Sequence, residues 1–352
     1  MKNISDIDKN FKTSGIDKKD AKFYNINEKP FKIYGIFKPE NDDEYIRIPR
    51  DVAAATGDGV KDLNSHTAGG RVRFKTNSKY IILKCFTKNV GTMPHMALTG
   101  VSGFDLYADG NYHGTAIPPF CSFDDGAAQG YDSIIEFPDN KMRDIIINFP
   151  LYNGVSDLLL GFEESAEIKE GNSYKYQTPI VFYGSSITQG GCASRPGNSY
   201  QSVLSRRLDC DFINLGFSGN AKGEDSIAEY ISKLDMSVFI YDYDHNAPDC
   251  EHLKNTHYKM YKKIRASHPD IPIIMASRPN RCGTDWCERI EIIKETLERA
   301  KNEGDNNIYF INGQDMFNLY DPNMMTVDGC HPNDFGFFCM AEAFEKVLRK
   351  VM

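Results

Sequence analysis

The chain has 352 residues, of which 41 % are hydrophobic and 26 % charged, and its formal net charge at pH 7 is -8. This length exceeds what one hydrophobic core usually serves, so the sequence predicts two domains. The acidic balance, without any densely basic stretch, argues against nucleic acid and membrane surfaces as partners. No apolar run is long enough to span a bilayer and no signal peptide is evident, so a cytoplasmic location is expected. Nine cysteines without a Cys-x-x-Cys pair predict free thiols rather than a disulfide framework.

The first part of the chain, residues 1–170, predicts an all-β domain. Short β-rich runs recur along it, and clusters of Gly, Asn, Asp and Pro separate them. The runs are Phe31–Phe37, Arg71–Phe74, Tyr80–Phe86, Gly103–Tyr107 and Asp144–Phe149. Asp109–Gly110, a dipeptide suited to a tight hairpin turn, follows the fourth run. Many short strands without a strong helical period predict an antiparallel sandwich or jelly roll.

The polar stretch Glu163–Gln177 predicts the connection between the domains. In residues 178–352, continuous apolar runs then alternate with amphipathic helical patterns. The runs are Pro179–Tyr183, Asp211–Asn214, Ser237–Asp242, Ile271–Met275 and Asn307–Asn312. The helical faces are Ile227/Ile231/Leu234, Ile290/Ile293/Leu297 and Phe337/Met340/Phe344/Val347/Val351. This alternation predicts an α/β domain with a doubly wound parallel sheet, whose ligand chemistry lies at the carboxyl ends of the strands.

A pair of serines directly after the first of these parallel strands is the first candidate for chemistry. The segment Gly184–Gly191 reads Gly-Ser-Ser-Ile-Thr-Gln-Gly-Gly. A serine at the end of a buried strand presents its hydroxyl to the crevice, but it needs a base within hydrogen-bond reach to act as a nucleophile. Ser185 and Ser186 both occupy this position. The same residue types also suit an ordinary turn and helix N-cap, and the segment alone leaves that alternative open.

A candidate base lies near the C-terminus, in the segment Asp328-Gly-Cys-His331-Pro. Histidine takes up and returns a proton near neutral pH, and a nearby aspartate can orient its ring and stabilise the imidazolium form. The spacing of three residues lets Asp328 and His331 turn toward one site. A structural histidine at a helix start is the alternative.

Two further segments follow strands and offer hydrogen-bond donors to an oxyanion. The stretch Asn214–Asn220 contains Gly216 and Gly219, and glycine lets backbone N–H groups approach a developing negative charge. The stretch Tyr243–Pro248 contains Asn246, whose side-chain amide can donate a further hydrogen bond. Each segment also fits ordinary turn chemistry.

Other polar residues are candidates for substrate contacts or ligands. Arg195 lies just beyond the serine turn, where a helix start explains it equally well, and Arg278 follows the fourth strand at the edge where substrate would bind. His66, His95 and His113 show no metal-ligand spacing, so the sequence predicts neither a metal site nor a cofactor.

Taken together, these segments resemble the SGNH hydrolases, also called GDSL esterases, in which Ser, Gly, Asn and His occur in this order. The similarity extends from Phe182 to His331 and includes the run Gly-x-Ser-Ile-Thr-x-Gly and the closing Asp-x-x-His-Pro. The resemblance implies a flavodoxin-like catalytic domain. It also favours Ser186 over Ser185, because Ser186 stands two residues after Gly184 and before Ile-Thr.

The resemblance implies a role for each matching position. Ser186 is the nucleophile, and its backbone N–H and that of Gly219 contribute to the oxyanion hole. The side-chain amide of Asn246 donates to the same oxyanion. His331 is the general base and then the general acid, with Asp328 as its orienting partner.

Two positions depart from the family pattern, and one short run extends it. Ser185 stands where the family usually has Asp, and Asp244–Ala247 replaces the usual Gly-x-Asn-Asp. In the first half, Gly103–Tyr107 is similar to the Gly-x-Asp-Leu-Tyr signature of a β-sandwich that precedes some SGNH esterase domains.

The function expected from this resemblance is hydrolysis of a small O-acyl ester, most simply an O-acetyl group on a sugar or oligosaccharide. One alternative is transfer of the acyl group to a hydroxylated acceptor by the same residues. Another is a non-catalytic carbohydrate-binding protein, which the presence of Ser186, Asp328 and His331 argues against.

Overall fold

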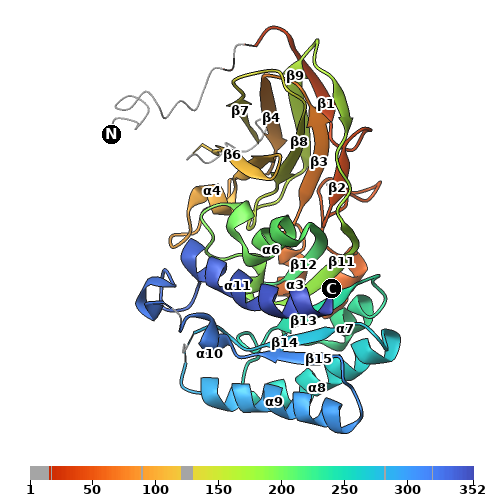
Figure 1. The fold of residues 1–352 in the computed structure, drawn as a ribbon, viewed down its shortest axis with the longest axis vertical. Helices are drawn as coiled ribbons and strands as arrows, with labels where there is room; N and C mark the ends of the chain where they lie inside the picture. Colours follow the sequence, from red (N-terminus) through yellow and green to blue (C-terminus); the bar gives the residue numbers. More distant parts are fainter. Residues whose placement is uncertain (1–15, 17, 89, 120–129, 281–282, 319) are drawn as a thin grey trace.

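Two antiparallel sheets form the upper half of the molecule in Figure 1, where the computed structural model describes residues 16, 18–88, 90–119, 130–280, 283–318 and 320–352. One sheet has the strand order β1-β9-β4-β7, and the other has β10-β3-β8-β5-β6 with β2 paired to β3. The strands are β1 (Ala21–Asn25), β2 (Lys32–Tyr34), β3 (Arg71–Thr76), β4 (Tyr80–Phe86), β5 (Phe104–Ala108), β6 (Asn111–Ala116), β7 (Gly130–Glu136), β8 (Arg143–Asn148), β9 (Asp157–Glu163) and β10 (Ile168–Glu170). The two sheets share one apolar core, which includes Val72, Leu83, Ile147 and Leu160. The predicted antiparallel sandwich is confirmed.

Asp109 and Gly110 join β5 to β6 in a hairpin, as the sequence predicts. Their φ angles are +50° and +79°, and a type I′ turn requires positive φ at both central residues. The expected linker differs from the structure, because Ile168–Glu170 forms β10 and pairs with β3. The partly buried Ile168 packs against the sandwich core, which explains why this short polar stretch is a strand.

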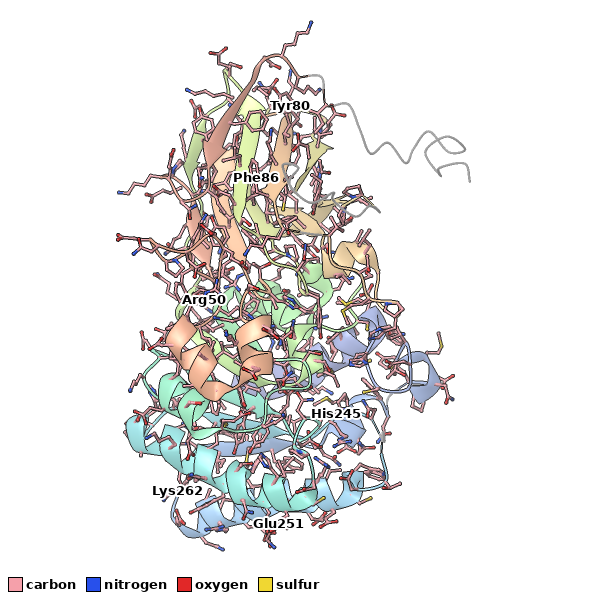
Figure 2. The ribbon with its side chains drawn as sticks, turned by 180° about the vertical axis from the view of Figure 1, so that it is seen from behind. Arg50, Tyr80, Phe86, His245, Glu251 and Lys262 are labelled. Atoms are coloured by element: carbon pink, nitrogen blue, oxygen red, sulfur yellow. The ribbon has the colours of Figure 1, made fainter. Side chains whose placement is uncertain are left out.

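Short helices also occur in the first half, where the sequence predicted strands alone. They are α2 (Arg50–Thr56), α3 (Asp58–Leu63) and the single turn α4 (Leu98–Val101). Ala53 of α2 and Val60 of α3 are buried in the core of the second domain, together with Val181 and Ile227. Figure 2 shows α2 and α3, in orange, below the sandwich and beside the helices of the second domain, with Arg50 at the start of α2. Helices this short have too few apolar positions to show a helical period.

The second domain is built on a five-stranded parallel sheet in the order β12-β11-β13-β14-β15. Its strands are β11 (Tyr176–Gly184), β12 (Cys210–Gly216), β13 (Val238–Asp242), β14 (Ile273–Ala276) and β15 (Ile308–Ile311). In chain order this arrangement is 2-1-3-4-5, the flavodoxin-like order. The predicted doubly wound α/β domain is therefore confirmed.

Helices cover both faces of this sheet (Figure 1). They are α5 (Ser186–Gln189), α6 (Tyr200–Leu208), α7 (Asp225–Ile231), α8 (Cys250–Ser267), α9 (Trp286–Asn302), α10 (Gly313–Met316) and α11 (Asp334–Val351), with 3-10 turns η1 (Pro196–Asn198) and η2 (Pro322–Met324). Apolar residues of α6 and α11 bury one face, and those of α7, α8 and α9 bury the other. Among the described helices, none is both long and apolar enough to cross a bilayer.

The chain reverses direction across the sheet at β11, and this reversal places the site. β11 lies between β12 and β13, and Gly184 at its end is level with Gly216 and Asp242. Loops that leave such a switch point diverge and open a crevice at the carboxyl ends of the strands. The serine segment begins here.

The described cysteines have free thiols, in agreement with the prediction. They are Cys85, Cys192, Cys210, Cys250, Cys287, Cys330 and Cys339. The other two, Cys121 and Cys282, lie outside the described residues.

Candidate active site

Ser186, His331 and Asp328 form a continuous hydrogen-bonded chain. Ser186 Oγ lies 2.9 Å from His331 Nε2, and His331 Nδ1 lies 2.8 Å from Asp328 Oδ2. Because a carboxylate only accepts hydrogen bonds, Nδ1 carries the proton and Nε2 is the acceptor for the serine hydroxyl. The structure thus brings together the three residues that the sequence predicts for nucleophilic chemistry.

The neighbouring Ser185 has a different, local role. It is the N-cap of α5, and its Oγ accepts the N–H of Ile187 at 3.2 Å. The preceding Gly184 faces Asp242 and Thr188 so closely that a Cβ at this position would overlap both side chains. A glycine before the serine pair is therefore needed to bring β11 against β13, and Ser186 is the serine that faces the histidine.

The loop before α11 holds Asp328 and His331 in register. Asp328 Oδ1 accepts the backbone N–H groups of Cys330 and His331 at 2.9 and 2.7 Å, which leaves Oδ2 for the imidazole. Partial burial acts to raise the pKa of Asp328, but the hydrogen bonds from the ring and backbone of His331 and from Cys330 lower it overall to about 2. Asp328 is therefore a carboxylate at neutral pH and can stabilise a protonated His331.

Two residues that the sequence analysis did not single out support the turn that carries Ser186. The Tyr152 hydroxyl donates to the backbone carbonyl of Ser186 at 2.9 Å. Gln189 is fully buried, and its Nε2 donates to the carbonyl of Leu151 at 3.1 Å while its Oε1 accepts the N–H of Ser218 at 3.0 Å. Gln189 therefore ties the serine turn to the loop after β12. Its place within the Gly184–Gly191 motif was the only signal in the sequence.

Gly219 lies in this loop after β12, next to Ser218. Its φ is +70° and, apart from its chain neighbours, no atom lies within 4 Å of the position a Cβ would occupy; the residue is exposed. The left-handed backbone explains why glycine stands here.

Asn246 lies in the corresponding loop after β13, on the other side of β11. Its backbone N–H donates to the carbonyl of Tyr243 at 2.9 Å and closes the turn. Its side-chain Oδ1 is buried and has no hydrogen-bond partner among the described residues. The structure thus places the two predicted oxyanion segments on either side of the strand that carries Ser186.

Arg278 is hydrogen-bonded to the loop that carries Asn246. Its Nε donates to Asp244 Oδ2 at 3.2 Å and its Nη2 donates to the Asp244 carbonyl at 3.3 Å. The Arg289 guanidinium donates to the carbonyl of Ala247 at 2.9 Å. Arg278 is only 6 % exposed and is bonded to this loop; its predicted contact with substrate stays a prediction.

His245 links this loop to the loop of the candidate base. Its Nε2 lies 3.1 Å from Cys330 Sγ. Burial, followed by the nearby charges of Arg278 and His331, lowers the pKa of His245 to about 4. His245 is therefore neutral at pH 7, and Figure 2 labels it in the α/β domain.

Arg195, the other predicted substrate contact, lies in the interface between the domains. Its Nη1 donates to Asp105 Oδ2 at 2.7 Å and to the Tyr107 hydroxyl at 2.6 Å, and its guanidinium stacks over the ring of Tyr112 at 3.9 Å. The sandwich strands therefore engage Nη1 of Arg195, whose side chain is 21 % exposed, and a role for Arg195 in substrate binding stays a prediction. The sequence could not show this, since Asp105 lies 90 positions away.

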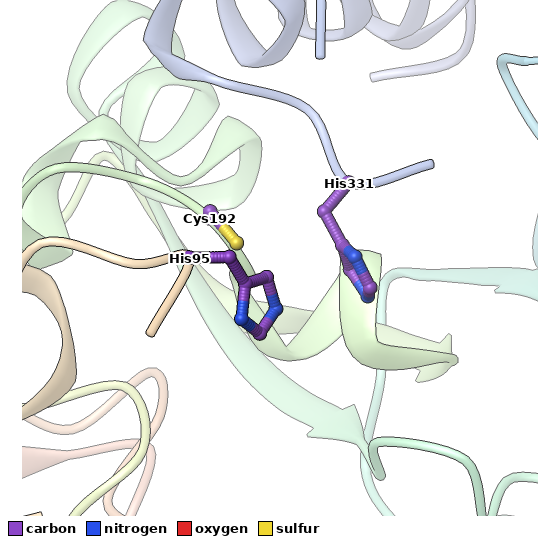
Figure 3. A group of neighbouring side chains, drawn as sticks. All are labelled: His95, Cys192 and His331. Atoms are coloured by element: carbon purple, nitrogen blue, oxygen red, sulfur yellow. The ribbon is translucent and has the colours of Figure 1, made fainter. Parts of the chain in front are cut away.

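His95 and Cys192 also lie beside His331, although the sequence gave no reason to join them (Figure 3). The ring centroids of His95 and His331 are 5.3 Å apart. Burial raises the pKa of the Cys192 thiol to about 12, so this thiol stays protonated at neutral pH and does not compete with Ser186 as a nucleophile. The sequence has no metal-ligand spacing, but the fold brings three side chains of metal-ligand type together.

Comparison with known proteins places both halves of the chain. A model of the GDSL-like lipase/acylhydrolase family matches residues 177–349. A model of the N-terminal domain of SGNH-hydrolase-type esterases, named GxDLY, matches residues 21–168. No curated protein matches the sequence.

Several solved structures are similar over nearly the whole chain. A Bacteroides ovatus ATCC 8483 protein assigned to the GDSL-like lipases is 29 % identical, with a TM-score of 0.82, over 94 % of this chain and 98 % of that chain. The salicylyl-acyltransferase SsfX3 from a tetracycline biosynthetic pathway is 16 % identical, with a TM-score of 0.77, over 95 % and 99 %. An acetyl xylan esterase from the rumen bacterium Butyrivibrio proteoclasticus is 13 % identical, with a TM-score of 0.58, over 94 % and 98 %. The last two show the fold alone. On the two family matches, the chain belongs to the GDSL-like lipase/acylhydrolase (SGNH hydrolase) family and carries the GxDLY N-terminal domain of SGNH-type esterases.

Proposed function

We propose that this protein is a serine esterase that removes small O-acyl groups, most simply acetyl groups, from a carbohydrate. The observation that carries the proposal is the hydrogen-bonded chain from Ser186 through His331 to Asp328, with links of 2.9 and 2.8 Å. This chain supplies a nucleophile, a base and an orienting carboxylate in the order that acyl transfer requires.

The first half of the reaction forms an acyl-enzyme. His331 Nε2 takes the hydroxyl proton of Ser186 as Oγ attacks the ester carbonyl carbon. The carbonyl oxygen becomes an oxyanion, which the backbone N–H groups of Ser186 and Gly219 and the amide of Asn246 stabilise. The tetrahedral intermediate then collapses, the C–O bond to the alcohol breaks, and His331 returns its proton to the leaving oxygen.

The second half releases the acid. A water molecule gives a proton to His331 and attacks the acyl carbon, and the same donors stabilise the second oxyanion. Collapse of this intermediate frees Ser186 Oγ, which recovers its proton from His331. Asp328 stays ionised throughout and stabilises the imidazolium form of His331.

The proposal of a sugar ester as substrate is supported by what two similar structures are named for. One similar structure is a family two carbohydrate esterase from Clostridium thermocellum in complex with cellohexaose, with a TM-score of 0.59, and another is the acetyl xylan esterase described above. A small acyl group agrees with the absence of a large apolar lid segment in the sequence.

The test combines a chromogenic ester with natural esters. The wild type should give a burst of p-nitrophenol from p-nitrophenyl acetate, Ser186→Ala should lose both burst and turnover, and Ser185→Ala should keep them. Acetate release from a panel of acetylated oligosaccharides then identifies the substrate. Retained turnover in Ser186→Ala, or inertness of the wild type toward a fluorophosphonate probe, would contradict the proposal and favour a binding protein.

Acyl transfer to an alcohol is the second candidate, and the similarity to the salicylyl-acyltransferase favours it. The residues and the acyl-enzyme would be the same, with an acceptor hydroxyl in place of water. Product analysis with and without an acceptor alcohol separates the two reactions, because a transferase yields an ester where a hydrolase yields free acid.

A further inference from the structure

Three side chains of metal-ligand type meet beside the candidate nucleophile. The ligand atoms of His95, Cys192 and His331 all lie within 4.8 Å of one another. Figure 3 shows the three side chains converging from three separate segments. His95 precedes α4 in the N-terminal half, Cys192 follows the serine turn, and His331 precedes α11. Only the folded chain with both domains in place assembles this group.

The donor set suits a particular class of ion. Two imidazole nitrogens and one thiolate sulfur are ligands of Zn²⁺ and of chemically similar ions, which bind N and S donors in tetrahedral geometry. With Zn–N of about 2.0–2.1 Å and Zn–S of about 2.3 Å, the donor atoms of such a site lie about 3.3–3.8 Å apart. The observed limit of 4.8 Å therefore requires adjustment of about 1 Å, which side-chain rotation can supply.

His331 is already oriented in the way that metal-binding histidines are. Its Nδ1 is held by the carboxylate of Asp328 at 2.8 Å, and a carboxylate on the outer nitrogen fixes the ring and raises its basicity at metal sites. The nitrogen that remains is Nε2, which also accepts the hydroxyl of Ser186 at 2.9 Å. A metal ion and Ser186 must therefore compete for one lone pair.

We propose that His95, Cys192 and His331 bind a divalent transition-metal ion of the Zn²⁺ class, and that the bound ion inhibits the esterase. On binding, the ion forms bonds to one nitrogen of each histidine and to Cys192 Sγ, loses water ligands, and releases the thiol proton to solvent. His331 can then no longer accept the Ser186 proton. The N-terminal half supplies one ligand of the site, His95, and the second domain supplies the other two. The inhibition rests on the proposed function, whereas the binding does not.

The activity test uses the full chain, freed of metal with a chelator. Zn²⁺ is titrated against p-nitrophenyl acetate turnover, and each variant is normalised to its own metal-free rate. Cys192→Ser and His95→Asn should each raise the Zn²⁺ concentration for half-inhibition by at least about tenfold. Changing a residue that only supports a metal ligand already weakens metal binding by about this factor, and these two variants remove a ligand itself. The matched controls Cys287→Ser, exposed on α9, and His113→Asn, exposed on β6, should match the wild type. Equal half-inhibition in all five proteins, or activation by Zn²⁺, would overturn the inhibitory site.

A binding test needs no turnover. Co²⁺ should give the wild type a thiolate charge-transfer absorption and tetrahedral d–d bands, and Ser186→Ala should retain them because its ligands are intact. Cys192→Ser should lose the thiolate band, whereas Cys287→Ser should keep it. Absence of the band from the wild type, or its persistence in Cys192→Ser, would overturn the site whether or not the protein is an esterase. Circular dichroism of each variant confirms that the fold is present.

Discussion

Asp105 of the sandwich and Arg195 of the catalytic domain form an ion pair across the domain boundary, with Oδ2 and Nη1 2.7 Å apart. Asp105 is fully buried, and it also accepts the Gly197 N–H at 2.9 Å and the Asn148 side-chain amide at 2.8 Å. A buried carboxylate with three donors is well compensated for its loss of water. This aspartate is the one in the Gly-x-Asp-Leu-Tyr run, so that run marks the point where the two domains are joined.

Replacing Asp105 should weaken the whole fold. Asp105→Asn removes the charge and puts an amide group against N–H donors, and we expect a loss of about 1.5–3 kcal/mol in the free energy of unfolding. The expected loss is smaller than the loss from breaking a fully buried ion pair, because Arg195 is 21 % exposed and can be partly solvated. Urea denaturation measures it. Asp139→Asn, whose side chain is 37 % exposed in its ion pair with Arg143, is the control and should lose clearly less; equal losses would contradict a special role for Asp105.

Asn246 should act on the rate of the chemical step. Asn246→Ala removes the proposed amide donor to the oxyanion, and we expect kcat for p-nitrophenyl acetate to fall about 10²–10³-fold with little change in KM. The control is Asn318→Ala, an exposed asparagine whose side chain contacts Asp315. Activity of Asn246→Ala within about threefold of the wild type, far short of the loss expected for an oxyanion donor, would remove Asn246 from the oxyanion hole.

Arg278 should behave as a positioning residue. Because its guanidinium holds Asp244 beneath the Asn246 loop, Arg278→Ala should lower kcat by displacing that loop, and Arg278→Lys should restore part of the rate. A substrate contact would instead raise KM. Steady-state kinetics on the two variants decides between these roles, and a rise in KM at unchanged kcat would support the sequence-based expectation of a substrate contact.

Asp242 should make stability depend on pH. Burial raises its pKa to about 8, although the hydrogen bond from Thr188 acts in the opposite direction. The folded state therefore holds a proton that the unfolded state, with the ordinary pKa of 3.8, releases. The contribution of the protonated Asp242 to the free energy of unfolding is fully present below about pH 4. It is lost as the pH rises toward about 8, by at most about 1.4 kcal/mol per pH unit.

Asp242→Asn tests this dependence. The variant should lack the decline, so the stability of the wild type relative to the variant should fall between about pH 5 and pH 8 in urea denaturation series. Asp139→Asn should run parallel to the wild type over this range, since the pKa of Asp139 is lowered from its ordinary value. A constant difference between wild type and Asp242→Asn would show that Asp242 is already ionised at the acidic end of the series.

Periodicity and motif position predicted much of this protein because both are local properties. The strand Pro179–Tyr183 is a continuous apolar run, and as part of β11 it lies inside the parallel sheet, between β12 and β13. The pairing of Ser186 with His331 follows from the resemblance to the SGNH hydrolases, which rests on motifs that are local in the sequence, one directly after a strand and the other before the last helix.

What escaped prediction depends on how the two domains dock. Arg195 lies at the start of a turn in the sequence, and only the packed sandwich shows that its partner is Asp105. His95 is an isolated histidine in a loop, and its approach to His331 follows from the same docking. The helices α2 and α3 were missed because each is stabilised by packing on the other domain rather than by its own pattern.

The hydroxyl of Tyr152, which supports the carbonyl of Ser186, has a practical consequence for dissecting the enzyme. A shortened chain begun near Tyr176 to isolate the hydrolase half would forfeit this support, and it would also uncover the apolar surface that Ala53 and Val60 now cover. A hybrid protein in which another sandwich domain replaces this one would need a tyrosine hydroxyl at the same position. The first half thus supports the serine turn and covers part of the core of the second half.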